Sequence, residues 1–293
     1  MRRIGGIEAG GTKFVCVLAD DQNNILDQRI VRTTTPEETL GQCIAFFQGH
    51  GGVAALGVAS FGPLVLDRAS PDYGRVAKTP KPHWSGADIV GTLRRGLDCP
   101  IALDTDVNGA GLAEALLGAG RGLDVVAYVT VGTGIGGGLI IQGKPVHGHT
   151  HPEMGHVKLR RHPRDEGFNG ACPFHGDCLE GLASGPAVMA RLGHPLNEAS
   201  PDHPIWDMLA YYLGELCAVL TLVASPQTIV LGGGVMSNPA LFPKIRAACA
   251  ISLGGYVQPP SGLDADRAYI VPPALGDRAG AIGALLLVRD APA

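Results

Sequence analysis

Two cysteines and a histidine occupy seven consecutive positions near the middle of the chain, within the stretch GACPFHGDC. Cys172, His175 and Cys178 are spaced so that one tight loop can turn all three toward a single ion. Thiolate and imidazole groups are the ligands that Zn²⁺ prefers, and a structural zinc site takes four of them. The stretch therefore predicts a metal site that needs one more ligand, and the alternative is a free thiol pair beside a surface histidine.

A second group of residues with chemical potential is DTDVNG, which follows the apolar run IAL. Asp106 stands where a predicted strand gives way to a helix, so its carboxylate can project toward a ligand. Phosphoryl transfer from ATP requires an aligned hydroxyl, a group that accepts its proton, and compensation of negative charge. Asp106 is therefore the candidate general base, whereas Asp104 is interpreted as a helix cap or a supporting residue.

Three glycine clusters each follow an apolar run, namely GIEAGGTK at 6–13, VGTGIGGG at 131–138 and LGGGVM at 231–236. Glycine lets backbone N–H groups approach phosphate oxygens, and the hydroxyl of Thr12 or Thr133 adds a donor. None of the clusters matches a P-loop or a well-placed dinucleotide-binding fingerprint. One cluster alone is typical of a tight hairpin, but three at strand ends indicate a ligand that carries phosphate.

The segments around these residues have the periodicity of alternating strands and helices. Short apolar runs at 3–9 and 14–19 and the alternating run at 25–33 predict a three-stranded meander. Further strands are predicted at 53–60 and 101–106, with helices at 36–50, where Thr35 is the expected N-cap, and at 107–118.

The strand pattern begins again after the glycine-rich segment 118–122. The predicted elements there are paired strands at 124–144, helices at 179–192 and 204–224, a strand at 226–235, a helix at 239–253, a strand at 268–272 and a helix at 277–289. Both halves open with paired strands at a glycine turn, which is α/β architecture. We expect two lobes, 1–118 and 119–293, with ligands bound between them and a final helix able to pack on the first lobe.

Composition narrows the class of protein. The 293 residues are 45% hydrophobic and 17% charged, so the chain can bury a sizeable core and is not of a disordered type. The net charge of −4 gives no support to a nucleic-acid partner. No 18-residue apolar run free of polar residues predicts a membrane span, and the N-terminal stretch MRRIGGIEAGGTK has no apolar segment of signal-peptide length. Five of the seven cysteines are scattered in apolar surroundings, which predicts reduced thiols and a cytoplasmic protein.

The long segment VTVGTGIGGGLIIQGKPVHGHTHPEMGH at 129–156 resembles the signature of the ROK family (repressors, uncharacterised frames and sugar kinases) almost position by position. GIEAGGTK resembles the first phosphate loop of kinases in the actin–hexokinase superfamily, and LGGGVM resembles its adenosine-binding turn. The resemblance covers nearly the whole chain and is nearest to the bacterial fructokinases of the family. It implies two ribonuclease-H-like lobes around a central cleft.

The resemblance also implies an activity, which is transfer of the γ-phosphate of ATP to a hexose, with fructose as the first candidate and fructose 6-phosphate as the product. Asp106 would accept the proton of the primary hydroxyl, ATP and Mg²⁺ would be required, and the enzyme would be a homodimer. The alternatives are a kinase for mannose, glucose or an N-acetylhexosamine, and a sugar sensor without catalysis. The chain departs from the family pattern at Glu8, usually an aspartate, and at Thr105, usually an asparagine.

Residue by residue, the resemblance implies two sets of small-molecule contacts. The sugar contacts are Gly62, Thr105, Asn108, Glu153, His156 and Glu180. The ATP contacts lie mostly in the glycine turns and are Gly10, Gly11, Thr12, Lys13, Thr133, Gly134, Pro186, Gly232, Gly233, Gly234, Val235 and Met236.

The resemblance further implies the fourth metal ligand, because His156 stands at the position that binds zinc in the family. The implied zinc site is then His156, Cys172, His175 and Cys178, with His151 as a rival for the fourth position. Four protein ligands leave no open position, so the zinc would be structural, and the second ring nitrogen of His156 would face the sugar. His147, His149 and His162 are interpreted as ordinary histidines.

Overall fold

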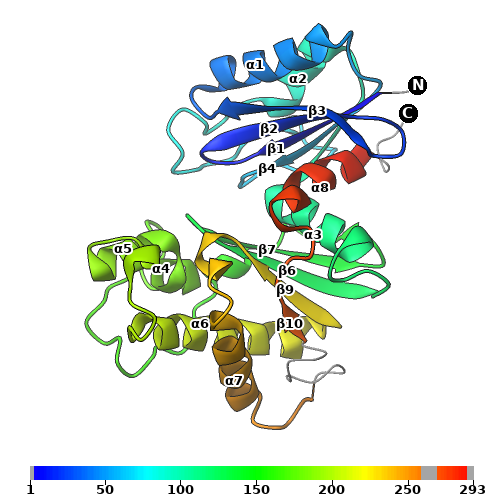
Figure 1. The fold of residues 1–293 in the computed structure, drawn as a ribbon. Coiled ribbons are helices and arrows are strands. Elements are labelled where there is room, and N and C mark those ends of the chain that lie inside the picture. The colour runs from blue at the N-terminus through cyan, green and yellow to red at the C-terminus, as the bar shows by residue number, and fades with distance from the viewer. Residues whose placement is uncertain (1–2, 259–268, 289–293) are drawn as a thin grey trace. The chain divides into compact units, whose positions relative to one another are not determined.

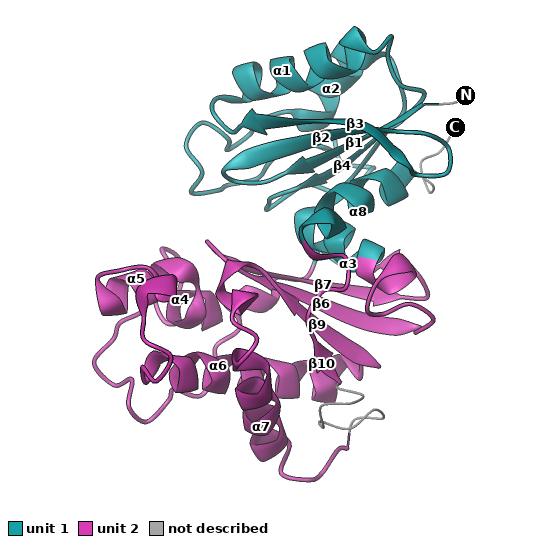
Figure 2. Ribbon diagram, viewed as in Figure 1, with its two compact units in different colours: residues 1–113, 147–151, 277–293 teal, residues 114–146, 152–276 magenta. Residues whose placement is uncertain are grey.

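A computed structural model of the chain describes residues 3–258 and 269–288 and contains two five-stranded sheets with helices packed against them (Figure 1). The chain divides into two compact units, shown in Figure 2. Unit 1 comprises residues 1–113, 147–151 and 277–293, and unit 2 comprises residues 114–146 and 152–276. The chain leaves unit 1 inside an unbroken helix, and it returns twice, whereas the sequence predicts one division after residue 118.

Unit 1 is built on a sheet in the order β3-β2-β1-β4-β5. Strands β1 (Ile4–Ala9), β2 (Lys13–Ala19) and β3 (Ile25–Arg32) form the predicted antiparallel meander. Strands β4 (Leu56–Ser60) and β5 (Ile101–Thr105) extend the sheet in parallel from β1. Every residue of β4 and β5 is buried, as expected of parallel strands covered on both faces.

Helices α1 (Pro36–Gly49) and α2 (Ile89–Leu97) lie on one face of this sheet, and α8 (Ala279–Leu287) lies on the other (Figure 1). The hydroxyl of Thr35 accepts from the N–H of Glu38, so the predicted N-cap of α1 is confirmed. Sequence periodicity leaves α2 unassigned. The final helix packs back on β1 and β4, as the sequence analysis allowed.

Unit 2 repeats the same sheet topology in the order β10-β9-β6-β7-β8. Its strands are β6 (Val125–Val131), β7 (Ile135–Ile141), β8 (Lys144–Pro145), β9 (Thr228–Gly232) and β10 (Ile270–Val271). As in unit 1, a hairpin opens the unit and later strands join it in parallel. The predicted α/β class with two related halves is confirmed.

The helices of unit 2 are α4 (Leu179–Ala183), α5 (Gly185–Leu192), α6 (Ile205–Ala224) and α7 (Leu241–Leu253), and α3 (Asp106–Leu117) joins the two units. Short 3₁₀ turns occur at Met154–His156, Leu196–Glu198, Gly234–Ser237 and Gly276–Arg278. The single helix predicted at 179–192 is wrong, because Ser184 is extended and its hydroxyl caps α5 by accepting from Ala187 N–H. Pro186 in the first turn of α5 favours this restart.

Helix α6 is long and apolar enough to cross a membrane by length and composition alone. However, 56% of its apolar window is buried inside unit 2, where the helix packs along α7. Leu209, Leu213 and Leu216 on this helix are fully buried in the largest hydrophobic cluster of the unit. The central helix of a globular unit has the same composition, and α6 is such a helix.

Candidate functional site

The junction of β5 and α3 carries Asp106 as the first residue of the helix. The hydroxyl of Thr105, just before it, accepts a hydrogen bond from the backbone N–H of Asn108 at 3.1 Å. This is the geometry of an N-cap, so Thr105 and neither neighbouring aspartate caps α3. The carboxylate of Asp106 accepts from the N–H of Val107 at 2.9 Å, and the residue is half-buried.

Asp104 is almost fully buried and gathers several donors at the same junction. Its Oδ1 accepts from the backbone N–H of Thr105 and from the side-chain amide of Asn108, each at 2.7 Å. The Nε2 of His147 lies 3.0 Å from its Oδ2. Asp104 is therefore the supporting residue of the two alternatives considered for it, and His147 is a partner that the sequence did not indicate.

The surroundings of two carboxyl groups near this junction favour their neutral, protonated forms. Burial raises the pKa of Asp106, and nearby backbone N–H groups and His151 oppose that shift. Burial, reinforced by the negative charge of Asp106, raises the pKa of Glu8 on β1 to about 7, although Lys13 lowers it. A cation or several hydrogen-bond donors supplied by a bound ligand would lower the pKa of both carboxyl groups.

The turn between β1 and β2 holds the first predicted phosphate contacts. The N–H of Gly10 donates to the carbonyl of Lys13 at 3.0 Å and closes the turn. Thr33, the residue after β3, holds the turn in place, since its hydroxyl donates to the carbonyl of Gly10 at 2.8 Å. Gly11, Thr12 and Lys13 are exposed at the tip, so their donors remain available to an anion.

The equivalent turn of unit 2 joins β6 and β7 and contains Thr133 and Gly134. The predicted sugar contact Glu180 reaches this turn from α4, because its Oε2 accepts from the N–H of Ile135 at 2.9 Å. A side chain on Gly134 would place its first carbon 2.7 Å from that oxygen, which explains the glycine. Pro186 follows Gly185, whose N–H donates to Gly132 at 2.7 Å, so the start of α5 is fixed to the turn as well.

The third glycine cluster follows β9. Gly233 has a φ of +91°, and a side chain there would meet the carbonyl oxygen of Val131 at 2.4 Å. Gly232 is buried against Tyr128, whereas Gly233 and Gly234 are exposed. The side chains of Val235 and Met236 turn inward and belong to the hydrophobic core of unit 2. A ligand at this turn would therefore meet the glycine backbone first.

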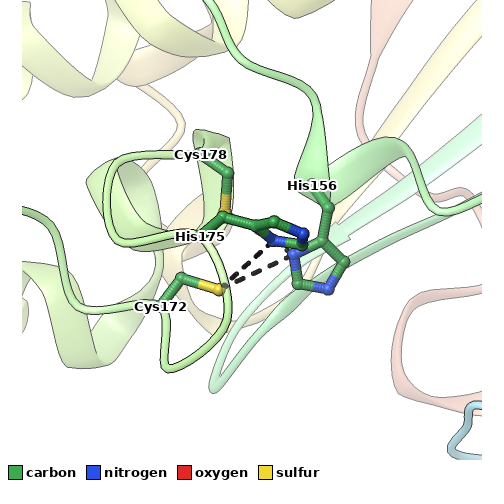
Figure 3. Close-up of side chains that lie close together, drawn as sticks. All are labelled: His156, Cys172, His175 and Cys178. Carbon is green, nitrogen blue, oxygen red and sulfur yellow. Dashed lines mark hydrogen bonds between the residues drawn. The ribbon is translucent and has the colours of Figure 1, made fainter.

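The four predicted metal ligands lie together in unit 2, as Figure 3 shows. The Nδ1 of His156 lies 3.5 Å from the sulfur of Cys178 and 3.8 Å from the sulfur of Cys172. The Nδ1 of His175 lies 3.7 Å from the sulfur of Cys172, and all four ligand atoms lie within 4.8 Å of one another. His151, the rival for the fourth position, is outside this group.

These separations suit one tetrahedral ion. Zinc bonds of about 2.3 Å to sulfur and 2.0 Å to nitrogen place tetrahedral ligands about 3.5 Å apart. Burial, followed by the neighbouring Cys172, raises the pKa of the Cys178 thiol to about 11, so a bound cation is needed to hold it as thiolate at neutral pH. The donor set therefore fits a structural Zn²⁺, which would fill its coordination with protein ligands.

The backbone of the metal loop is tightly folded. The N–H of Gly176 donates to the carbonyl of Cys172 at 2.9 Å, and the N–H of Leu179 donates to Val157, next to His156, at 2.9 Å. A side chain on Gly181 would overlap the carbonyl oxygen of Gly176, which is 1.8 Å from its first carbon position. The loop and the start of α4 are thus folded on each other.

A buried ion pair supports this loop from outside. Arg191 of α5 contacts Asp165 through two nitrogens, at 2.7 and 3.2 Å, and the hydroxyl of Tyr212 on α6 donates to the same carboxylate at 2.7 Å. Arg161 contacts Asp177, which precedes the last cysteine ligand, at 3.5 Å and also donates to the backbone carbonyl of Asp165. The segment after His156 is therefore fixed to two helices of unit 2.

The structure distributes the predicted residues over the two units. Unit 1 holds the predicted base and the first phosphate turn together with Gly62, Thr105 and Asn108. Unit 2 holds Glu153, His156 and Glu180, the metal ligands and the other two glycine turns. Sequence reasoning missed His147 and also the role of His151, whose Nε2 accepts from the N–H of Leu64 at 3.2 Å. Their partners lie far away along the chain, so the spacing of residues in the sequence does not indicate either contact.

Comparisons with known proteins extend over both units. Residues 4–291 match the sequence profile of the ROK family. The chain is 47% identical over 294 residues to a fructokinase of Zymomonas mobilis, which covers 98% of this chain and 96% of the relative. It is 41% identical over 288 residues to a fructokinase of Pediococcus pentosaceus, with 98% of each chain covered. A ROK hexokinase from Thermus thermophilus has a similar structure, with a TM-score of 0.76, 26% identity and 98% of each chain covered.

Proposed function

Because the chain belongs to the ROK family, we propose that it is an ATP-dependent fructokinase that transfers the γ-phosphate of ATP to the 6-hydroxyl of D-fructose. Its products are fructose 6-phosphate and ADP. The observation that carries the proposal is the carboxylate of Asp106, presented at the start of α3 beside a network of buried hydrogen bonds. Identity of 47% and 41% to two fructokinases supports fructose as the acceptor.

Asp106 acts as the general base. It accepts the proton of the 6-hydroxyl as that oxygen forms its bond to the γ-phosphorus and the bond to the β-phosphate oxygen breaks. Burial raises the pKa of Asp106, which brings its basicity closer to that of an effective base at neutral pH. The capping bond of Thr105 and the donors around Asp104 hold the helix start, and with it the carboxylate, in one orientation.

The glycine turns bind the nucleotide in this proposal. Gly10, Gly11, Thr12 and Lys13 of unit 1 provide exposed donors for phosphate oxygens, and the turn containing Thr133 and Gly134 provides the same in unit 2. The β9 turn, from Gly232 to Met236, receives the adenosine, and Pro186 lies beside the β6–β7 turn. Glu8 would help to hold Mg²⁺ through a bound water, and the ion would supply neutralisation of phosphate charge.

The sugar contacts and the metal centre are linked through His156 in this proposal. Its Nδ1 faces the two cysteine sulfurs, which leaves Nε2 on the other side of the ring for a sugar hydroxyl. Glu153 and Glu180, near the metal ligands in sequence, supply carboxylates that accept from hydroxyls. Gly62, Thr105 and Asn108 complete the set, and the buried Oδ1 of Asn108 lacks a partner among the described residues. Zn²⁺ fixes the ring of His156 and takes no part in phosphate transfer.

A panel of hexoses in a coupled assay of ADP release tests the proposal. The purified protein is given ATP, Mg²⁺ and D-fructose, D-glucose, D-mannose or an N-acetylhexosamine in turn. The expected result is the highest kcat/KM with fructose and formation of fructose 6-phosphate. Preference for another hexose would contradict the assignment of fructose. Sugar binding without ADP release would contradict the kinase activity and favour a sugar sensor without catalysis.

The proposal includes a cytoplasmic homodimer with no nucleic-acid partner. All seven cysteines are free and buried, as in a protein kept in a reducing compartment. The dimer is implied by the family resemblance, and light scattering coupled to size exclusion gives the mass in solution. A mass of one chain across micromolar concentrations would contradict it.

A further inference from the structure

The short segment 147–151 belongs to unit 1, although the residues before and after it belong to unit 2. Both of its ends are attached to unit 1 by histidines. His147 contacts Asp104 on β5, and His151 accepts from the N–H of Leu64. The residues between these two histidines, GHT, include no hydrophobic side chain. Imidazole contacts with polar groups, and not hydrophobic packing, therefore attach it.

The contact of His147 with Asp104 is a close ion pair. Nε2 of the imidazole lies 3.0 Å from Oδ2 and 3.1 Å from Oδ1 of the carboxylate. The side chain of Asp104 is 6% exposed, whereas that of His147 is 40% exposed. The hydrogen bond to Asp104 raises the pKa of His147, and the charged imidazolium is thereby favoured. Burying a carboxyl group is costly unless it is paired or hydrogen-bonded, so this contact offsets the burial of Asp104.

Asp104 in turn determines the shape of the β5–α3 junction. It accepts from the backbone of Thr105 and from the amide of Asn108, which are the residues on either side of Asp106 and Val107. The amide of Asn108 also lies 3.4 Å from the ring of His147. A change in the charge or position of Asp104 would therefore be transmitted to the carboxylate of Asp106 through both of its flanking contacts.

We propose that His147 is a positioning residue for phosphate transfer, which acts through Asp104 to hold the carboxylate of Asp106 in its reactive orientation. The inference rests on the proposed kinase function. It assigns to His147 no direct contact with sugar or nucleotide, so the chemical step depends on His147 more than sugar binding does. Small displacements of a reacting group reduce the rate of the chemical step far more than they reduce binding.

Kinetics of three variants test the proposal. His147→Phe keeps a ring but removes the donor, and His147→Gln keeps one donor near the position of Nε2. We expect the first to lower kcat with fructose by about 10–100-fold, with KM for ATP changed less than about threefold and KM for fructose changed by a smaller factor than kcat. We expect the second to recover most of kcat, because the donor to Asp104 is restored.

The matched control is His149→Gln, in the same segment, on a residue that is exposed and placed in no binding or catalytic role. It is expected to leave kcat unchanged. Unchanged kcat in His147→Phe would overturn the proposal, and so would a loss confined to the KM of fructose, which would make His147 a sugar contact. If His147→Phe does not fold, as judged by thermal melting, His147→Gln and His147→Asn replace it, since the shorter Asn cannot place its donor at Nε2.

A measurement without turnover separates this inference from the kinase assignment. The imidazole of His147 is titrated by NMR in the intact protein and in Asp104→Asn. The expected titration midpoint lies above 6.5 in the first and falls in the second, and equal midpoints would overturn the pairing. Failure of the unaltered protein to release ADP with any hexose would reject the proposed function, while this titration would still report on the pairing.

Discussion

The metal centre of unit 2 and the carboxylate junction of unit 1 are organised in different ways. Three of the four metal ligands come from one short loop, and the fourth lies 16 residues before the first of them. The junction gathers Asp104, Asp106 and Asn108 with His147, which is 43 residues from Asp104. One site is local in sequence, whereas the other depends on the return of a distant segment.

The two sites also differ in what holds them together. The junction is held by hydrogen bonds among its own residues, so its arrangement needs no ligand. The metal centre brings thiols and imidazoles to ion-sized separations, and burial raises the pKa of Cys178 to about 11. Such a cluster is stable as thiolate only with a cation. This difference supports the proposal that Asp106 carries the chemistry and that the metal centre supports the proposed sugar contacts of unit 2.

The largest expected effect comes from removing the base. Asp106→Asn keeps the shape of the side chain and its contact with Val107 but cannot accept a proton. We expect kcat with fructose to fall by about 10²–10⁴-fold, the usual contribution of general base catalysis. The coupled ADP assay measures it, with zinc content unchanged. Asp21→Asn, in an exposed turn of the same unit, is the control, and full activity in Asp106→Asn would remove the distinction between the two sites.

The second prediction concerns the ion pair behind the metal loop. Asp165→Asn leaves Arg191 buried without its counter-charge, since the two side chains are 3% and 9% exposed. Breaking such a pair costs about 3–5 kcal/mol in the free energy of unfolding. Urea unfolding measures the loss, and release of zinc to a chromophoric chelator is expected to accelerate.

The matched control for that change is Asp207→Asn, which removes the exposed pair with Lys244 at 2.6 Å. Exposed pairs contribute about 0.2–1 kcal/mol, so this variant is expected to unfold nearly as the unaltered protein does. Equal losses in the two variants would show that burial does not govern the support of the metal loop.

Much of the fold and three of the four ligands of the metal centre can be predicted from local sequence patterns. The hairpin-first pattern of each half predicts the two sheets, because apolar runs and glycine turns are local signals. The cysteine spacing predicts three metal ligands for the same reason. Helix α2 was missed although Asp88 caps it, with Oδ1 accepting from Gly91 N–H at 2.8 Å. Its buried face of Ile89, Val90 and Leu93 covers little more than two turns, which is too short for a clear period.

Features that depend on tertiary contacts were beyond the sequence. A histidine in HGHTH has no neighbour in sequence that marks it as a partner of Asp104, and only the return of segment 147–151 to unit 1 supplies one. The sequence leaves Asp104 as a cap of α3 or a supporting residue, because the hydroxyl of Thr105 is equally able to cap and spacing alone does not distinguish them. The break at Ser184 is of the same kind.

A third prediction concerns Glu8 in unit 1, whose effects on stability and on nucleotide affinity are measured separately. Burial raises the pKa of Glu8 from 4.5 to about 7, so folding favours its neutral form. Stability from this group is fully present below pH 4.5 and is lost as the pH rises through 7. Glu8→Gln removes that dependence and is expected to be up to about 3 kcal/mol more stable at pH 8, with no difference at pH 4.

Denaturant unfolding of both proteins at pH 4, 6 and 8 checks this expectation, with the exposed Glu37→Gln as control. Affinity for ATP in the presence of Mg²⁺ is expected to fall in Glu8→Gln, since the carboxylate proposed to help hold the ion through a bound water is lost. A variant that is less stable at pH 8 would contradict the sign of the shift. Unchanged nucleotide affinity would place Glu8 outside the ATP site.

The smallest expected effect comes from removing the metal, and it tests most directly whether the two sites are separate. Without a cation the ring of His156 loses its fixed partners, while the contact of Glu180 with Ile135 at the phosphate turn involves no metal ligand. We therefore expect metal-free protein to show a dissociation constant for fructose raised about tenfold, with ADP affinity within about twofold. Calorimetry with sugar and with ADP measures both, metal analysis verifies removal, and added Zn²⁺ is expected to restore fructose binding. Unchanged fructose binding would show that the metal does not support the proposed sugar contacts. An equal loss of ADP binding would show that the metal organises the whole of unit 2, because the phosphate turn would then depend on it too.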